Sequence, residues 1–368
     1  MSKWYKHDAV GDFLWRENPN YYHFHDDLMK YPEAWCFVVW SRRGPGKTYS
    51  ALRYAYEEKI PIVYMKRTKD DVDTVCGNRG GIDLSPYVPI NRDGHYHITS
   101  QLIYKGIGGF YDTYDDDGKI CGSPFSYIVA LNAMKTVKGF DLSVCDWMLL
   151  DEFIPQSGEI VRHKEGGMLL DMYMTVARDR VKRGREDLKL ILFANAENIS
   201  TPITNELDIV DDMINLQASG ESHFYIEERG IMLHHITEEE IPIQEKEKSG
   251  IYKAMLGTDW GIKAFGGDFS NNDFSNVGKY NMKNFQPVVG YRYKNKNVYV
   301  YRKEELLFFT TSSNNVCDVY DLKLENDQKR FYLDYVIDFQ QECIQGYCKF
   351  KSYTMYDLIM NYKKFFNI

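Results

Sequence analysis

The feature that most constrains the fold of this chain is a glycine-containing loop between a buried strand and a helix. The apolar run Ala34–Trp40 predicts a strand buried on both faces. The loop Ser41-Arg-Arg-Gly-Pro-Gly-Lys-Thr48 follows it, and Thr48–Glu58 has the spacing of a helix with one apolar side. A buried strand that leads through a tight turn into a helix is typical of α/β proteins with parallel sheets.

More segments of the N-terminal half follow the same pattern. A helix is expected over Asp171–Arg183. Residues 84–120, rich in Gly, Asp and Tyr, predict an antiparallel hairpin region at the sheet edge. Further buried strands are expected at Ile60–Met65, Phe125–Leu131, Trp147–Leu150 and Leu188–Ala194. Buried strands joined by helices predict a parallel α/β sheet.

The loop itself has the chemistry of a phosphate-binding loop. It departs from the pattern GxxxxGK[ST] at one position, Ser41. Glycines let the backbone wrap phosphate oxygens, Lys47 can reach the β- and γ-phosphates, and the Thr48 hydroxyl can bind Mg²⁺. The alternative is a glycine turn with a surface lysine. The predicted nucleotide contacts are Ser41, Arg42, Arg43, Gly44, Pro45, Gly46, Lys47, Thr48 and Asp151.

Two acids follow the apolar residues Trp147–Leu150. A buried strand that ends in Asp151 places this carboxylate at the carboxyl edge of the sheet, where it can bind Mg²⁺ together with Thr48. The adjacent Glu152 can act as the general base that activates water. The alternative is a strand that ends in an ordinary acidic turn. The phosphate loop upstream therefore favours the catalytic interpretation of Asp151 and Glu152.

Other polar residues near this edge have two interpretations each. Arg42 and Arg43 either sense the γ-phosphate or point to solvent. Asn195, at the end of Leu188–Ala194, either contacts the γ-phosphate or the attacking water or simply forms a turn. The run from Arg178 to Arg185 is by default a solvated helix face, and its alternative is an arginine finger that enters a neighbouring subunit's site.

Composition limits how the chain can meet nucleic acid. It has 45 Lys and Arg against 53 Asp and Glu, a formal net charge of −8, so DNA or RNA binding requires a local basic patch. Ten of the acids lie in Thr204–Glu240, whereas Lys279–Lys303 holds seven bases and no acid. This basic segment includes a predicted hairpin, Val288–Tyr293 with Asn297–Tyr301, and its alternative role is a solvated surface. Candidate DNA contacts are Lys279, Lys283, Arg292, Lys294, Lys296, Lys135 and Lys138.

Length and residue usage exclude several classes. The 368 residues suggest two domains, and no apolar run reaches the 18 residues that would span a membrane. The N-terminal Met1–Tyr5 lacks the apolar core of a signal peptide. Seven scattered cysteines without a CxxC pair predict free thiols in a reducing compartment. The pairs His23/His25 and His95/His97 have same-face strand spacing, but no Cys or carboxylate cluster completes a metal site.

Taken together, these motifs resemble the DNA-packaging ATPases of small tailed phages of the φ29 type. Those proteins are additional-strand, catalytic-glutamate (ASCE) P-loop ATPases related to large terminase subunits. The matching segments are Arg43–Thr48, Asp151–Phe153, Thr175–Arg180 and Asn195–Ala196. Their order and spacing agree across residues 35–200.

The resemblance implies roles that the residues alone leave open. Arg43 would act in cis, Arg178 would be the trans-acting finger with Arg180 as a second candidate, and Asn195 would couple hydrolysis to movement. The chain would form a homomeric, pentameric ring at the procapsid portal in the host cytoplasm. There it would use ATP and Mg²⁺ to move double-stranded DNA, in some members with a structural RNA. The adenine would lie against Tyr21, Tyr22 and Phe24.

The resemblance also implies the domain organisation. Residues 1–236 would form the ATPase domain, 237–278 a linker or lid, and 279–368 a small α+β domain of RNase H-like nuclease fold. Clustered acids would be needed for two metals in a working nuclease. Pro287–Tyr301 has none, so a vestigial domain that does not cut is expected. The competing hypotheses are a terminase-like ATPase with an active nuclease, and a nucleotide-gated DNA-binding or scaffold protein without turnover.

Overall fold

The computed structural model describes residues 18–368 except 78–82, 157, 160, 244–249, 256, 259–260, 262–268, 270–271, 273, 314–317 and 367. Met1–Tyr5 and much of the predicted linker 237–278 therefore lie outside the described residues. The chain divides into two compact units. One comprises residues 1–206 and 215–270, and the other comprises 207–214 and 271–368.

A mixed nine-stranded sheet forms the centre of the first unit, in the order β3-β4-β5-β2-β6-β7-β1-β9-β8. Six strands that are adjacent in this order, β5, β2, β6, β7, β1 and β9, are each parallel to their neighbours within the group. Their side chains are almost entirely buried, because helices cover both faces. The strands are β1 Cys36–Ser41, β2 Ile62–Lys66, β3 Thr99–Tyr104, β4 Ile107–Tyr111, β5 Ser126–Ala130, β6 Trp147–Asp151, β7 Lys189–Asn195, β8 His223–Ile226 and β9 Ile231–Ile236.

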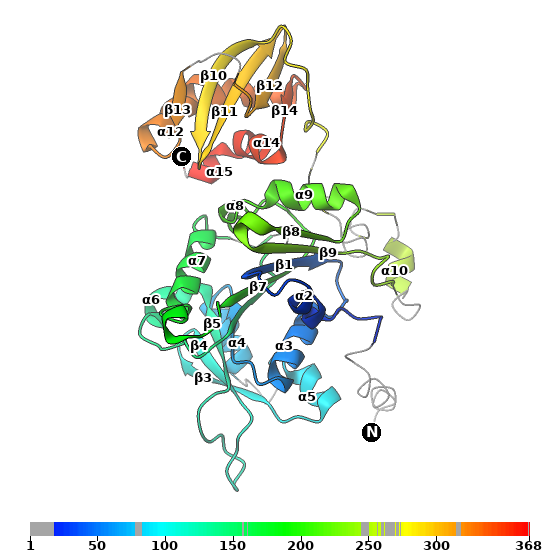
Figure 1. The fold of residues 1–368 in the computed structure, drawn as a ribbon, viewed down its shortest axis with the longest axis vertical. Helices are drawn as coiled ribbons and strands as arrows, with labels where there is room; N and C mark the ends of the chain where they lie inside the picture. The colour runs from blue at the N-terminus through cyan, green and yellow to red at the C-terminus, as the bar shows by residue number, and fades with distance from the viewer. Residues whose placement is uncertain are drawn as a thin grey trace. The chain divides into compact units, whose positions relative to one another are not determined.

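Helices lie on both sides of this sheet, with α2, α3 and α5 on one side and α6, α7 and α8 on the other (Figure 1). Among the described residues, short 3₁₀ turns occur in the connections at Leu131–Ala133, Val181–Arg183 and Glu227–Arg229. The described helices are α2 Phe24–Lys30, α3 Lys47–Glu57, α4 Lys69–Cys76, α5 Val88–Gly94, α6 Met134–Val137, α7 Glu165–Val176, α8 Pro202–Glu206 and α10 Gly250–Met255. Helix α9, Val210–Ser219, has residues of both units. The predicted parallel α/β sheet is confirmed.

Most predicted elements of the first unit appear within two residues of their expected bounds. The hairpin β3–β4 lies antiparallel at the sheet edge within residues 84–120, as predicted. The prediction of one helix over Asp171–Arg183 is wrong at both ends. Helix α7 ends at Val176, before Arg178, and Asp179 has a positive φ of 55°, so the chain turns between Arg178 and Arg180 instead of carrying both on a helix face.

Strand β9 has no counterpart in the sequence predictions. It pairs in parallel with β1 along its whole length, although it contains His234 and His235. Both histidines are buried because they have partners. His234 bonds Asp27 and Glu240, and the His235 ring stacks on Trp40 at 5.2 Å between centroids. Two imidazoles interrupt the apolar run that would have indicated a buried strand.

A mixed five-stranded sheet, ordered β13-β10-β11-β12-β14, forms the second unit together with its helices. The predicted hairpin is confirmed as the antiparallel pair β10–β11. The core of the second unit is aromatic, with Tyr291, Phe309, Phe331 and Phe350 almost fully buried. The elements are β10 Gln286–Tyr293, β11 Lys296–Lys303, β12 Leu306–Thr310, β13 Val319–Asp321, β14 Cys348–Phe350, α12 Glu325–Phe331, a π turn Tyr332–Val336, α13 Ile337–Ile344, α14 Tyr353–Met360 and α15 Tyr362–Phe366. A small α+β unit therefore follows the α/β unit, as predicted.

The division into units differs from the predicted boundaries because residues 207–214 belong with the second unit. There Asp211 accepts hydrogen bonds from the backbone and hydroxyl of Thr354, at 3.1 and 2.8 Å. Asp208 pairs with Lys296 at 2.8 Å.

Six described cysteines are free thiols, and five of them are buried. Among the described residues, none of the helices has the length and hydropathy of a membrane span.

Candidate active site

Three neighbouring strands bring the predicted site residues to one edge of the sheet. Strand β7 lies between β1 and β6 and is parallel to both. In this register Ser41 of β1 is opposite Asn195, and Asp151 of β6 is opposite Phe193. Since the carboxyl ends of parallel strands meet at the same edge, the loop after β1 and the acids after β6 lie on either side of Asn195.

The loop after β1 has the backbone shape that phosphate binding requires. Gly44 and Gly46 have φ values of 103° and 89°, in a region that side-chain-bearing residues rarely adopt. Helix α3 begins directly afterwards at Lys47, so its N-terminal N–H groups and positive dipole end face the loop. The backbone N–H of Tyr22 donates to the carbonyl of Pro45 at 2.9 Å and fixes the loop from the other side.

Lys47 is buried at the centre of this edge. Its Nζ donates to the Ser41 hydroxyl at 2.5 Å and to Oδ1 of Asn195 at 3.4 Å. Burial lowers the pKa of Lys47 to about 8, against the opposing attraction of Asp151. A desolvated ammonium held by only neutral partners is well suited to receive an anionic oxygen.

Thr48 and Asp151 meet as the predicted metal ligands should. Burial raises the pKa of Asp151, while the Lys66 charge and a hydrogen bond from the Thr48 side chain act in the opposite direction. The Tyr64 hydroxyl also donates to Asp151, at 3.4 Å. A hydroxyl and a carboxylate beside a phosphate-binding loop are oxygen ligands of the kind that Mg²⁺ takes. The residues present therefore fit this ion.

Glu152 is held in a strained conformation, with a φ of 56°. Its Oε1 accepts a hydrogen bond from Gln156 at 3.1 Å. Its carbonyl and that of Phe153 accept hydrogen bonds from one guanidinium nitrogen of Arg67, at 3.2 and 3.1 Å. The backbone is thus fixed while the carboxylate stays at the sheet edge beside Asp151.

The sequence predictions missed Arg67. Its other nitrogens pair with Glu165 at 2.6 Å and Glu159 at 2.9 Å, so it connects the turn after β6 to the start of α7. Arg67 comes directly after β2, and β2 pairs in parallel with β6. Its position at that strand end is a signal that could have found it.

The two loop arginines have different surroundings. Arg42 is 6% exposed and donates to the carbonyls of Arg43 at 3.0 Å and Ile241 at 3.3 Å. Its side chain ties the loop to the segment after β9, and the predicted role of Arg42 as a nucleotide contact remains a hypothesis. Arg43 is exposed on the loop and keeps its predicted role as a hypothesis.

The two candidate finger residues also differ. Arg178 is exposed just beyond the end of α7. Arg180 is 2% exposed and pairs with Asp146 at 2.5 Å. Its guanidinium also donates to the carbonyls of Ser143, Cys145 and Glu186. Because its guanidinium is buried and bonded within its own chain, Arg180 is not placed to enter a neighbouring subunit's site. The structure therefore indicates a structural role for Arg180 instead of the predicted role as a second finger candidate.

Two of the three predicted adenine contacts belong to the core. Phe24 is fully buried and packs edge-on against Phe37 and Phe193. Tyr22 is 4% exposed and donates its hydroxyl to Asp27 at 2.6 Å. Tyr21 is 40% exposed and lies next to Gly46, where an added Cβ would come within 3.3 Å of its ring. Of the three predicted adenine contacts, Tyr21 is therefore the one that lies exposed beside the phosphate loop.

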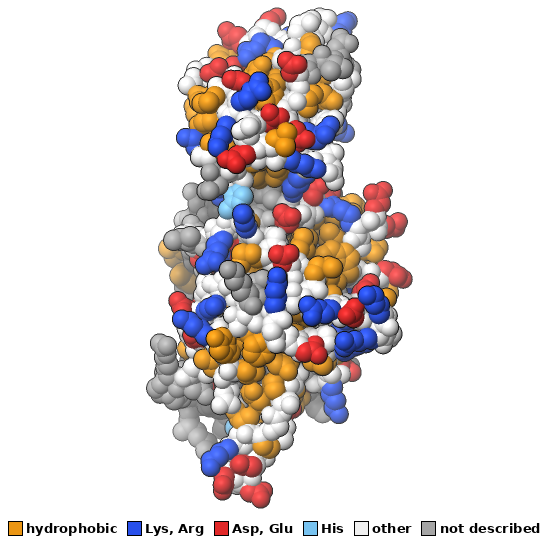
Figure 2. Space-filling model, turned by 90° about the vertical axis from the view of Figure 1, so that its left-hand side faces the viewer, with side chains coloured by type: hydrophobic (Ala, Val, Ile, Leu, Met, Phe, Trp, Pro, Cys, Tyr) orange, Lys and Arg blue, Asp and Glu red, His pale blue; other side chains and the backbone are white. Residues whose placement is uncertain are grey.

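The candidate DNA contacts are scattered. Lys279, Lys283 and Lys138 are exposed. Arg292 and Lys296 pair with Asp321 and Asp208, at 3.7 and 2.8 Å, and Lys294 lies over the Tyr293 ring. Lys135 is in α6, and its side chain is outside the described residues. Figure 2 shows one face of the molecule, on which basic and acidic side chains alternate without a continuous basic area.

The predicted histidine pairs stay apart from any carboxylate cluster within the described part of the chain. The rings of His23 and His25 are 5.8 Å apart, and His25 pairs with the exposed Asp26. His95 and His97 are exposed. The group of metal-ligating side chains that the described residues do contain lies elsewhere, at Asp27, His223 and His234.

Comparison with known proteins extends this picture. No protein-family model and no curated protein sequence matches the chain. Its backbone is similar to the Phi-28 gp11 DNA packaging motor, with a TM-score of 0.61 and 15% identity over 95% of this chain and 99% of that one. The bacteriophage Phi-29 viral genome packaging motor assembly gives a TM-score of 0.59 and 15% identity, over 94% and 99% of the two chains. Across nearly its whole length, this chain therefore has the fold of phage DNA-packaging motor proteins.

Proposed function

We propose that the chain is a Mg²⁺-dependent ATPase that moves double-stranded DNA into a phage procapsid. The observation that carries this proposal is the convergence of Lys47, Thr48, Asp151 and Glu152 at one sheet edge. The similarity in fold to two packaging motors directs the proposal toward DNA.

Each residue has a distinct part in this chemistry. Backbone N–H groups of the loop and the Lys47 ammonium would bind the phosphates, and the exposed Arg43 would contact them in cis. Thr48 and Asp151 would hold Mg²⁺, which supplies neutralisation of phosphate charge. Glu152 would accept the proton of the attacking water, in a position fixed by the hydrogen bonds of Arg67 to its backbone.

Strand β7 would be the additional strand that gives the ASCE class its name, since it separates β1 from β6. Asn195 at its end accepts a hydrogen bond from Lys47 at 3.4 Å. A phosphate that draws Lys47 away would release this amide. Such a change is a physical means for Asn195 to sense the state of the site and to couple hydrolysis to movement.

Arg178 would complete the site of a neighbouring subunit. It follows α7 and precedes β7, so it lies toward the edge of the sheet opposite its own phosphate loop. From this position Arg178 would act in trans, in a homomeric ring for which we propose five subunits. Glu152→Gln and Arg178→Ala proteins should each be inactive alone, and mixing them should restore turnover, because some interfaces then combine native Glu152 with native Arg178. Mixtures no more active than their components would contradict a trans-acting role.

The second unit would contact nucleic acid without cutting it. On its paired strands β10 and β13, Arg292 and Asp321 are opposite each other and form an ion pair, so this acid is already neutralised. The exposed Lys279 and Lys283 would contact phosphates of DNA or of a structural packaging RNA. The partners would be the portal and the DNA, and the location would be the portal vertex in the host cytoplasm.

The direct test is ATP turnover with and without double-stranded DNA. We expect Mg²⁺-dependent hydrolysis that double-stranded DNA stimulates and that Lys47→Ala abolishes through loss of nucleotide binding. An exposed-lysine control, Lys105→Ala, which lies outside the candidate nucleotide and DNA contacts, should keep the native ATPase rate. Nucleotide binding without hydrolysis under any of these conditions would favour the scaffold alternative and overturn the proposal.

A further inference from the structure

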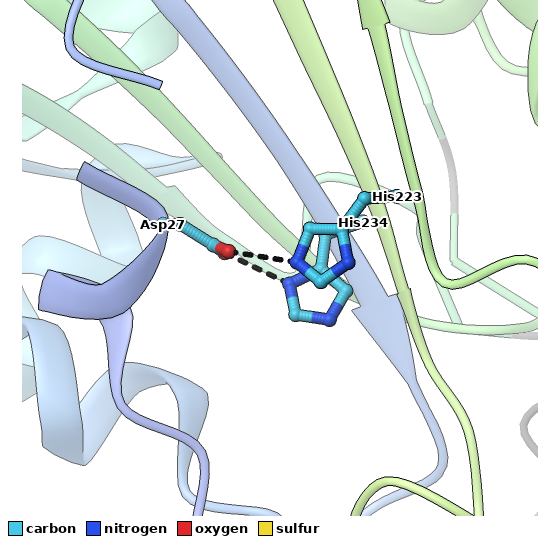
Figure 3. A group of neighbouring side chains, drawn as sticks. All are labelled: Asp27, His223 and His234. Carbon is cyan, nitrogen blue, oxygen red and sulfur yellow. Dashed lines mark hydrogen bonds and ion pairs between the residues drawn. The ribbon is translucent and has the colours of Figure 1, made fainter. Parts of the chain in front are cut away.

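A cluster of two imidazoles and two carboxylates lies apart from the phosphate loop, between α2 and the strand pair β8–β9. Figure 3 shows Asp27 of α2 pointing at the rings of His223 and His234. The carboxylate oxygens of Asp27 lie 3.1 Å from Nε2 of His223 and 2.8 Å from Nδ1 of His234. The side chains of Asp27 and His234 are each 2% exposed and that of His223 is 16% exposed. Helix α2 and the sequence-distant strand pair β8–β9 thus direct potential ligand atoms at one point.

The far side of each ring is also held. Nε2 of His234 is 3.0 Å from Glu240, and Nδ1 of His223 is 2.7 Å from the Ser222 hydroxyl. Histidines that bind metals usually have their second ring nitrogen held by a carboxylate, carbonyl or similar group, which sets the tautomer and the ring orientation. Here both rings have that support and turn their other nitrogen toward Asp27.

Balancing the two carboxylates of the cluster with protons alone would require both histidines to be charged. Asp27 and Glu240 carry two negative charges, and among the hydrogen bonds and ion pairs of these described residues no lysine or arginine takes part. One protonated histidine leaves one net negative charge on the cluster, which the partly exposed Glu240 shares with the solvent. Two protonated histidines would place like charges in rings stacked 3.8 Å apart. A divalent cation bound by neutral imidazoles balances the two carboxylates without this repulsion.

We propose that Asp27, His223 and His234 bind one divalent transition-metal ion of the zinc class. The three ligand atoms lie within 4.8 Å of one another, compared with roughly 3.3 Å along a tetrahedral edge when bonds are near 2.0–2.1 Å. Two nitrogens and an oxygen favour zinc over Mg²⁺ and Ca²⁺, which take oxygen ligands. With three protein ligands, the fourth position of a tetrahedral ion would be taken by water.

The site would be structural, and its consequences would reach the phosphate loop. Tyr22 donates its hydroxyl to Asp27 and its backbone N–H to Pro45 of the loop. Arg42 of the loop donates to the carbonyl of Ile241, next to Glu240. A metal that joins α2 to β8 and β9 would therefore stiffen both attachments of the loop. The site does not depend on the proposed ATPase, so a Glu152→Gln protein should bind the metal as the native protein does.

The test uses untagged full-length protein, stripped of metal by a chelator and titrated with Zn²⁺ by calorimetry. Co²⁺ is added in parallel to record the ligand-field absorption of a tetrahedral site. We expect one ion per chain, and His223→Gln should weaken binding by roughly 100-fold or more. His223 is the variant of choice because it is the most exposed of the three ligands, and circular dichroism checks that it folds.

A His95→Gln/His97→Gln protein is the matched control, because it removes two histidines outside the cluster and should keep native affinity. No stoichiometric zinc binding by the native chain would overturn the proposal. So would equal affinity in the His223→Gln protein, which would place the ion elsewhere, including the candidate nucleotide site. A preference for Mg²⁺ over Zn²⁺ would overturn the assignment to the zinc class.

Discussion

At the scale of residues, arginines show best how far a sequence pattern can lead. Arg178 and Arg180 are two positions apart in one basic run, and the pattern makes them equivalent candidates. The structure buries Arg180 against backbone carbonyls just before β6 and leaves Arg178 at the surface. The Lys47, Thr48, Asp151 and Glu152 site was predictable because local motifs specify it. Arg67 and the Asp27 cluster were not, because their partners are distant in sequence.

Substitution of the two arginines should therefore change the stability of the protein by very different amounts. Arg180→Ala leaves the carbonyls of Cys145 and Glu186 without the guanidinium donor and should lower the free energy of unfolding by about 3 kcal/mol. Arg178→Ala should change it by less than about 0.5 kcal/mol. Denaturant unfolding of the two proteins measures the difference. Equal stability of both variants would contradict the structural role of Arg180.

Arg67 should act on turnover through the position of Glu152. Arg67→Ala removes both hydrogen bonds to the strained turn, and we expect kcat to fall by about 10–100-fold while the KM for ATP changes little. Steady-state ATPase kinetics test this. Arg92→Ala, at a half-exposed position in α5, is the control and should behave as the native protein. A rise in KM at constant kcat would show that Arg67 serves nucleotide binding instead.

At the scale of elements, apolar patterns predicted strands well and helix ends poorly. Strands β1, β2, β5, β6 and β7 are continuous apolar runs, and each was expected within two residues of its observed bounds. Strand β9 was missed because its two histidines are buried by partners that the pattern cannot show. The end of α7 was misplaced because the turn at Asp179 follows from tertiary contacts of Arg180 rather than from a helix-breaking residue.

Two adjacent glycines of α7 should respond oppositely to alanine. A Cβ on Gly166 would clash with the carbonyl of Pro202 and with Glu206 of α8, whereas a Cβ on Gly167 meets nothing within 4 Å. Gly166→Ala should destabilise the protein by about 1–3 kcal/mol. Gly167→Ala should stabilise it by about 0.5–1 kcal/mol, because alanine loses less backbone entropy in a helix. Thermal unfolding of both variants tests the close packing of α7 on α8, and a stabilised Gly166→Ala protein would contradict it.

At the scale of the whole molecule, the net charge of −8 is consistent with a DNA-moving protein only if its basic groups act locally. The structure narrows the candidates, because Arg292 and Lys296 already have acidic partners and Lys279 and Lys283 are exposed. Sequence could not reveal this pairing, because Asp208 and Lys296 are 88 residues apart (296 − 208).

Charge reversal at these exposed lysines should affect DNA and leave the nucleotide site intact. Lys279→Glu/Lys283→Glu should reduce the stimulation of ATP turnover by double-stranded DNA, most clearly at low salt, and leave the rate without DNA unchanged. A Lys323→Glu/Lys363→Glu protein, altered at other lysines of the second unit, is the control. Unchanged stimulation in the first protein would exclude these contacts.

The second unit should not cut DNA. Incubation of the native protein with supercoiled plasmid in Mg²⁺ or Mn²⁺ should leave the plasmid intact. Specific nicking, absent when the second unit carries substitutions of its acids, would favour the terminase-like alternative.

The central claim is that Glu152 is the base of an ATPase that works on double-stranded DNA. The most direct measurement is single-turnover ATP hydrolysis by native and Glu152→Gln proteins in the presence of double-stranded DNA, with the exposed Glu221→Gln as control. We predict that Glu152→Gln binds ATP with native affinity and hydrolyses it about 10²–10⁴-fold more slowly, while Glu221→Gln keeps the native rate. Equal hydrolysis rates in the native and Glu152→Gln proteins would contradict the account.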